Sequence, residues 1–154
     1  MVVVLFTACD DTESVVFDSV NGQTLASFGT SSSDLQVIIN ESGEREVQVN
    51  LTTQSSVDRT VIIGVDEAST ASAENYTVPN QVVIPAGAFI GNFTVSGIDN
   101  SVETDKESII INLVSVEGGL VSSSVHTVSL FQVCPVPVEF MIGDYILTDN
   151  TTNA

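Results

Sequence analysis

The side chains in this sequence that could do chemistry are carboxylates, and many of them lie in loops. The 154 residues contain 20 Asp+Glu against 3 Lys+Arg, a formal net charge of −17 at pH 7. Loops that gather several carboxylates are what calcium requires, because it takes six to eight oxygen ligands at about 2.3–2.6 Å. The acidic excess therefore fits either the solvated surface of an exported protein or divalent-cation binding.

Other chemistry has little support. The cysteines are Cys9 and Cys134, His126 is the single histidine, and there is no CxxC pair, so a zinc site or a Cys/His nucleophile is almost excluded. A Gly-x-Ser-x-Gly elbow is absent, and 0 Trp and 2 Tyr leave no aromatic platform for a sugar. His126 alternates with Val128 and Leu130, which predicts a packed strand residue rather than a base. We assign no catalytic residue and predict that the chain is not an enzyme.

The charge balance also argues against nucleic acid as a partner. Binding to DNA or RNA requires a basic surface that neutralises phosphates. The three cations, Arg45, Arg59 and Lys106, are scattered along the sequence and cannot build one.

The acidic loops separate segments in which apolar and polar residues alternate, the pattern of half-buried strands. No helical period is long enough to matter, and the length suits one domain with tails. The pattern predicts an all-β fold, an immunoglobulin-like antiparallel β-sandwich of about seven strands. The expected strands lie near residues 35–39, 47–51, 60–65, 82–84, 93–98, 109–113 and 125–131.

The segment from Glu74 to Val114 resembles the later half of a Calx-beta domain. Asn75-Tyr76-Thr77 precedes a strand, a Pro85-Ala86-Gly87 turn and a second strand that ends at Asp99-Asn100. An acidic loop containing Glu103 to Glu107 and a further strand then follow. The resemblance covers about residues 35–132, to which we assign the sandwich.

The resemblance implies calcium as a cofactor, because calcium-binding members gather carboxylates at one end of the sandwich. Carried across residue by residue, the candidate ligands are Glu41, Asn75, Asp99, Asn100, Glu103 and Glu107. Asn75 and Asn100 depart from the family pattern, which has Asp at both positions. Each change removes one unit of charge, and calcium affinity follows charge. The alternative is that these loop acids are solvated.

The first nine residues, MVVVLFTAC, resemble the end of a bacterial lipoprotein signal, in which the cysteine is lipid-modified. Phe6 stands where Leu is usual and no positive charge precedes the apolar run, so we expect the true start to lie upstream. Asp10 and Asp11 resemble signals for display on the outer face of the Gram-negative outer membrane, although an aspartate there resembles an inner-membrane retention signal in other lineages. We predict a lipid anchor on Cys9 and a surface-exposed location in the cell envelope.

Two flanking segments complete the predicted organisation. Residues 10–34 read as a tether with an accessory hairpin around Asn21-Gly22, or with a strand that joins the sandwich. Residues 133–154 read as a linker, marked by Pro135 and Pro137, followed by the start of a truncated further β domain.

Together these features predict a non-enzymatic lipoprotein module that serves in adhesion, as a spacer or in binding, with weak calcium binding as an option. The alternative is an accessory glycan-binding lipoprotein of an outer-membrane nutrient-uptake system. The partners expected are the membrane, through Cys9, and a protein or glycan ligand.

Overall fold

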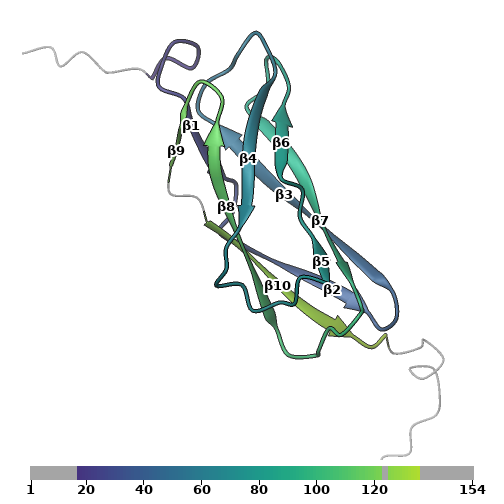
Figure 1. The fold of residues 1–154 in the computed structure, drawn as a ribbon. Coiled ribbons are helices and arrows are strands. Elements are labelled where there is room, and N and C mark those ends of the chain that lie inside the picture. Colours follow the sequence, from purple (N-terminus) through teal and green to yellow (C-terminus); the bar gives the residue numbers. More distant parts are fainter. Residues whose placement is uncertain (1–16, 123–124, 136–154) are drawn as a thin grey trace, which may run out of the picture.

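A computed structural model describes residues 17–122 and 125–135 of the chain, and every regular element in these ranges is a β-strand (Figure 1). The strands are β1 (Leu25–Phe28), β2 (Ser32–Ile38), β3 (Ser42–Leu51), β4 (Arg59–Val65), β5 (Tyr76–Thr77), β6 (Gln81–Ile84), β7 (Ile90–Ile98), β8 (Glu107–Val116), β9 (Leu120–Val121) and β10 (Val125–Val133).

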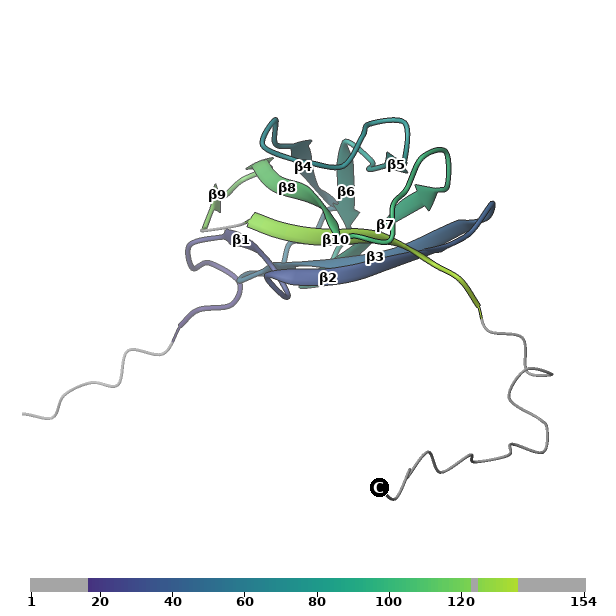
Figure 2. The ribbon, with the colours of Figure 1, turned by 90° about the horizontal axis from the view of Figure 1, so that it is seen from below.

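The strands form two five-stranded sheets packed face to face (Figure 2). The first sheet has the order β5-β7-β3-β1-β9, and the second has the order β2-β10-β8-β4-β6. The predicted all-β, immunoglobulin-like sandwich is confirmed. Most neighbouring strands are antiparallel, but β2 pairs with β10 and β1 with β9 in parallel. The chain changes sheets at every connection between consecutive strands, and each parallel pair joins strands that lie far apart in the sequence.

The sandwich begins earlier in the chain than Leu35, the start predicted from the sequence. Leu25–Phe28 forms β1 and pairs with β3, so this segment is the strand that joins the sandwich rather than one arm of an accessory hairpin. The turn at Asn21-Gly22 closes on itself, since the Gly22 N–H donates to the Asp18 carbonyl at 2.9 Å. The other predicted arm, Val15-Val16, lies outside the described residues, as do Cys9 and residues 136–154.

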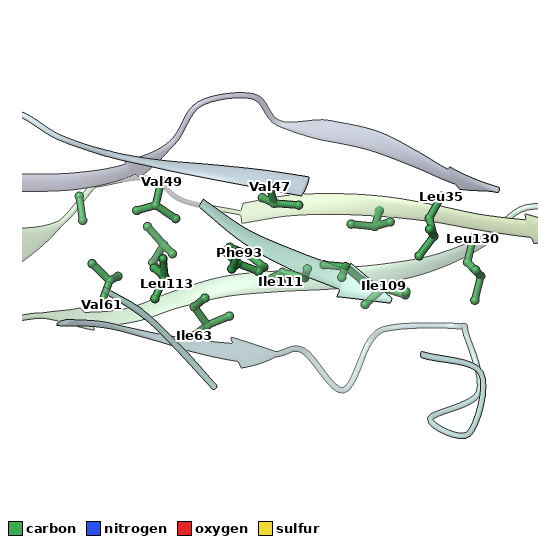
Figure 3. Close-up of a cluster of buried hydrophobic side chains, with 14 of the residues drawn as sticks. Leu35, Val47, Val49, Val61, Ile63, Phe93, Ile109, Ile111, Leu113 and Leu130 are labelled. Carbon is green, nitrogen blue, oxygen red and sulfur yellow. The ribbon is translucent and has the colours of Figure 1, made fainter. Parts of the chain in front are cut away.

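The core is a single layer of aliphatic side chains between the sheets (Figure 3). Alternate residues of each long strand point inward, among them Val47 and Val49 of β3, Phe93 of β7, and Ile109 and Ile111 of β8. Each fully buried aliphatic side chain contributes about 1.5–3 kcal/mol to folding. The alternation in the sequence therefore corresponds directly to the inner faces of the sandwich.

Glycines let strands of the first sheet cross closely over the edges of the second. A Cβ on Gly43 of β3 would lie 2.0 Å from the Gln36 carbonyl oxygen of edge strand β2, and one on Gly91 of β7 would lie 3.1 Å from the Val83 carbonyl oxygen of edge strand β6. The Arg45 Nε–H also donates to the Asp34 carbonyl of β2 at 2.6 Å. These contacts cover part of the edges at which another chain could otherwise add a strand.

Replacing Gly43 with alanine should lower the free energy of unfolding by about 1–3 kcal/mol, because the new methyl group meets a backbone carbonyl that cannot rotate away. Urea unfolding measures the change. Gly64→Ala is the matched control, because its Cβ would meet only a Val114 side-chain methyl, at 3.1 Å. Equal losses in the two variants would contradict the role assigned to Gly43.

Candidate functional site

The six predicted ligands all lie at one end of the sandwich, although they come from three parts of the sequence. Glu41 is in the β2–β3 turn, Asn75 directly precedes β5, and the other four lie between the end of β7 and the first residue of β8. The chain leaves β10 at the same end, where the Ile39 N–H donates to the Val133 carbonyl at 3.3 Å. We call residues 39–41, 72–76 and 98–107 the loop end; it is at the lower right in Figure 1.

Asp99 joins three segments of the loop end. Its Oδ2 accepts hydrogen bonds from the Asn40 N–H at 2.6 Å and from the Gln132 Nε2 group of β10 at 2.9 Å. The Asp99 N–H donates to the Glu41 carbonyl at 3.1 Å. Asn40 has a φ of 61°, a left-handed conformation that asparagine tolerates better than most residues. One carboxylate thus fixes the β2–β3 turn and the end of β10 against the β7–β8 loop.

Asn75 is fully buried beside the same loop. Its Oδ1 accepts hydrogen bonds from the N–H and the hydroxyl of Ser101, at 3.1 and 3.3 Å, and its carbonyl accepts from the Ile98 N–H at 2.8 Å. Its Nδ2 is buried and has no hydrogen-bond partner in the structure. The Asn100 Nδ2 donates to the Glu74 carbonyl. The two asparagines therefore tie the segment before β5 to the segment after β7 through direct hydrogen bonds.

The glutamates of the predicted set are arranged differently. Glu41 and Glu103 have exposed side chains and contribute main-chain groups instead: the Glu103 carbonyl accepts from the Gln132 N–H at 2.8 Å. Glu107 is half-buried, is paired with Leu130 of β10, and has a buried Oε2 without a hydrogen-bond partner. The fold therefore brings the six residues to one end but does not bring their side-chain oxygens to one point.

This arrangement does not fit calcium. Among the described residues, no three His, Cys, Asp or Glu side chains are grouped so that they could hold a metal ion. Asp99 already accepts two hydrogen bonds through Oδ2, and Asn75 uses Oδ1 to hold Ser101. Calcium needs six to eight oxygens, so the ligands that the resemblance implies would have to leave these partners to reach an ion.

Sequence reasoning missed three residues that complete this network: Asn40, Ser101 and Gln132. Asn40 carried a usable signal, since asparagine in a turn between strands favours the left-handed conformation observed. The sequence held no such signal for Gln132 or Ser101. Neither residue belongs to a motif, and the role of each depends on which loops are neighbours in the folded chain.

His126 is packed inside the sandwich, which confirms its predicted position. Its Nδ1 lies 2.8 Å from the Thr30 carbonyl, which can only accept, so Nδ1 carries the proton. Its Nε2 lies 2.8 Å from the Ser33 hydroxyl, and the Phe28 ring packs at 5.4 Å between centroids. The histidine is 1% exposed and holds the crossover between the sheets.

All three cations make contacts within the chain. The Arg59 guanidinium donates to the carbonyls of Thr53 and Gln54, at 3.3 and 3.0 Å. The Lys106 ammonium lies 2.9 Å from Asp34 and 4.8 Å from the centre of the Phe131 ring. With Arg45 bound to the Asp34 carbonyl, the cations neutralise little of the surface acid.

The outer faces of the two sheets offer different surfaces. The first sheet exposes Glu44, Glu46 and Gln48 of β3 beside Asn92 and Thr94 of β7. The second sheet exposes an apolar stripe across four strands, Val83, Ile62, Val114 and Val125. No pocket is found in residues 17–122 and 125–135. None of these residues forms a helix of the length and apolarity needed to cross a bilayer.

No family model matches the sequence, and no curated protein is similar to it. Solved structures are similar. The apo form of the Calx CBD1 domain is 18% identical, with a TM-score of 0.57, covering 71% of this chain and 97% of that domain. The calcium binding domain CBD12 of CALX1.1 is 23% identical (TM-score 0.56; 70% of this chain, 45% of that one). A Bacteroides ovatus protein to which carbohydrate binding is provisionally ascribed is 9% identical (TM-score 0.56; 69% and 36%).

At these identities the comparisons establish the fold alone, which is a Calx-beta-like β-sandwich. The chain spans nearly all of the single Calx domain but less than half of the other two proteins.

Replacing Asp99 with alanine should lower the free energy of unfolding by about 1–3 kcal/mol, because it leaves two hydrogen-bond donors without their acceptor. Hydrogen exchange at the Asn40 amide should also become faster. Asp105→Ala removes an exposed carboxylate of the same loop and serves as the control. If the two variants unfold at the same urea concentration, Asp99 does not hold the loop end together.

Proposed function

We propose that this chain is a non-enzymatic module of a cell-envelope lipoprotein, anchored to the outer membrane through a lipid on Cys9, with the sandwich as a spacer or binding domain outside the membrane. The observation that carries the proposal is the path of the chain, which enters the sandwich at one end and leaves it at the other (Figure 1).

The two ends are defined by separate contacts. At the entry, the Ser19 carbonyl accepts from the Gln54 N–H at 2.8 Å and the Thr24 carbonyl accepts from the Leu120 N–H at 2.9 Å. At the exit, β10 ends at Val133, beside Ile39 and the Asp99 network. Nine residues of β10 span about 30 Å at the usual rise of a strand. A domain connected in this way adds its full length to the distance between the membrane anchor and any segment beyond β10.

The surface chemistry supports an extracellular module. Uncompensated acid keeps a domain soluble and limits self-association through charge repulsion. The Calx domains and the Bacteroides ovatus protein are described by binding or by structure and not by a reaction, which supports a non-enzymatic role. Without a pocket in the described part, a ligand of this domain would be bound on the face of a sheet or on the loop end.

The second candidate is an accessory glycan-binding lipoprotein of a nutrient-uptake system. It is favoured by the Bacteroides ovatus neighbour to which carbohydrate binding is provisionally ascribed. The chain covers 36% of that protein, so its likeness does not extend to the remainder. In this alternative the glycan would be held by a domain located after β10, and the sandwich would still be the spacer.

Lipid anchoring is tested by placing the chain behind a complete lipoprotein signal, with Leu5 to Cys9 intact, in a Gram-negative host. We expect the protein in the membrane fraction, with a mass increased by the lipid. Cys9→Ser should move it to the soluble fraction, whereas Cys134→Ser, which changes the only other cysteine, should leave it in the membrane. A Cys9→Ser variant that stays in the membrane fraction would refute the anchor.

Display on the cell surface is tested separately, by treating intact cells with proteinase K. Surface exposure predicts that the tether before β1 is cut while a periplasmic marker protein stays whole. Replacing Asp10 and Asp11 with serine should protect the protein if these residues direct its export. Complete protection of the unaltered protein would mean that the sandwich lies on the periplasmic side of the outer membrane and would contradict surface display.

A further inference from the structure

The loop end is closed by hydrogen bonds at the place where the family resemblance implies a cation. We infer that Asn75, together with Asp99, makes the closure of this end independent of calcium, and that the amide group of Asn75 is the feature that decides this. This property belongs to the sandwich alone and does not depend on the proposed anchor.

Asp99 carries the negative charge that would be the strongest reason to recruit a cation. Its Oδ2 instead meets two N–H donors, the Asn40 main chain at 2.6 Å and the Gln132 side chain at 2.9 Å. N–H groups directed at a carboxylate oxygen occupy the positions that a cation would take and form charge-assisted hydrogen bonds with it. The three segments that meet at Asp99 are therefore joined without an ion.

Asn75 is buried and differs from an aspartate by one heavy atom. Its Oδ1 holds Ser101 and would do the same in an aspartate. Its Nδ2 is neutral and has no partner, and Glu107 also has a buried oxygen, Oε2, without a partner. An aspartate would replace the neutral Nδ2 with a second carboxylate oxygen. A buried carboxylate whose second oxygen has neither a donor nor a counter-charge is strongly destabilising, so the loop end would then need a cation.

Asn100 is exposed and acts in the same direction as Asn75. Its Nδ2 donates to the Glu74 carbonyl, directly beside Asn75. An aspartate would place an acceptor against an acceptor and remove one of the hydrogen bonds between the two segments. The departure at Asn75 therefore replaces a buried charge with a neutral group, and the departure at Asn100 replaces an acceptor with a donor that holds the Glu74 carbonyl.

The test is thermal unfolding of the full chain, under reducing conditions, in millimolar calcium chloride and in excess EGTA. The unaltered protein should unfold at the same temperature in both solutions. In EGTA, the Asn75→Asp variant should unfold at a temperature at least about 4 °C below that of the unaltered protein. This is the shift expected when a buried polar contact is lost in a domain of this size. Calcium should restore most of that difference.

Asn80→Asp is the matched control, because it makes the same exchange at an exposed position and should respond to neither solution. If Asn75→Asp does not fold in EGTA, Asn100→Asp applies the same test at an exposed position, with a smaller shift and the same recovery in calcium. A rise in the unfolding temperature of the unaltered protein with calcium overturns the inference. An aspartate variant that is destabilised but does not respond to calcium overturns the role given to the amide. Neither result bears on the lipid anchor, which is tested separately by the membrane fractionation of the Cys9→Ser variant.

Discussion

The burial of alternate side chains along β3, β7, β8 and β10 is the constraint on which the rest of this structure depends. A shift of one residue in any of these strands would turn its whole apolar face to solvent, so the register is fixed wherever the face is buried. The register then decides where each loop begins. Ser42 is paired with Ile98, which places the β2–β3 turn beside Asp99, and Tyr76 is paired with Gly97, which places Asn75 beside Ser101. The loop end is thus a consequence of the core.

The sequence was sufficient to predict the long strands and the sandwich, because each of β3, β7, β8 and β10 contains several inward apolar residues two positions apart. It was not sufficient for β5 and β9, since two residues cannot show a period, or for the parallel pairs, which join strands far apart in the sequence. The resemblance to the Calx-beta domain implied that the candidate ligands lie at one end of the sandwich, and the fold brings them there. Their side-chain directions could not be predicted, because loop backbone decides whether a residue such as Glu41 offers its carboxylate or its carbonyl.

The charge distribution explains why direct hydrogen bonds matter at the loop end. With three cations in the chain, all engaged elsewhere, no side-chain cation is left to balance Asp99. Main-chain N–H groups and side-chain amides are then the remaining donors, and Asn40 and Gln132 supply them to Asp99. A hydrogen bond to a charged acceptor contributes about 1.5–3 kcal/mol, more than most exposed ion pairs. An acidic protein can therefore close a loop cluster without metal where the donors are aimed at its carboxylates.

The parallel pairs bear on the proposed spacer role, because they join the first strands of the sandwich to the last. β2 and β10 are paired over seven residues, from Ser32 with Thr127 to Ile38 with Val133. The chain passes through β1 before it reaches the start of this pair, and it leaves the domain at the end of the pair (Figure 1). A pull on the two ends would therefore act along the strands and load all of these hydrogen bonds together, whereas two antiparallel strands pulled from one end separate one bond at a time. The Asp99–Gln132 bond adds a side-chain link at the point where the force would leave the domain. A spacer built in this way resists extension at the same contacts that close its loop end.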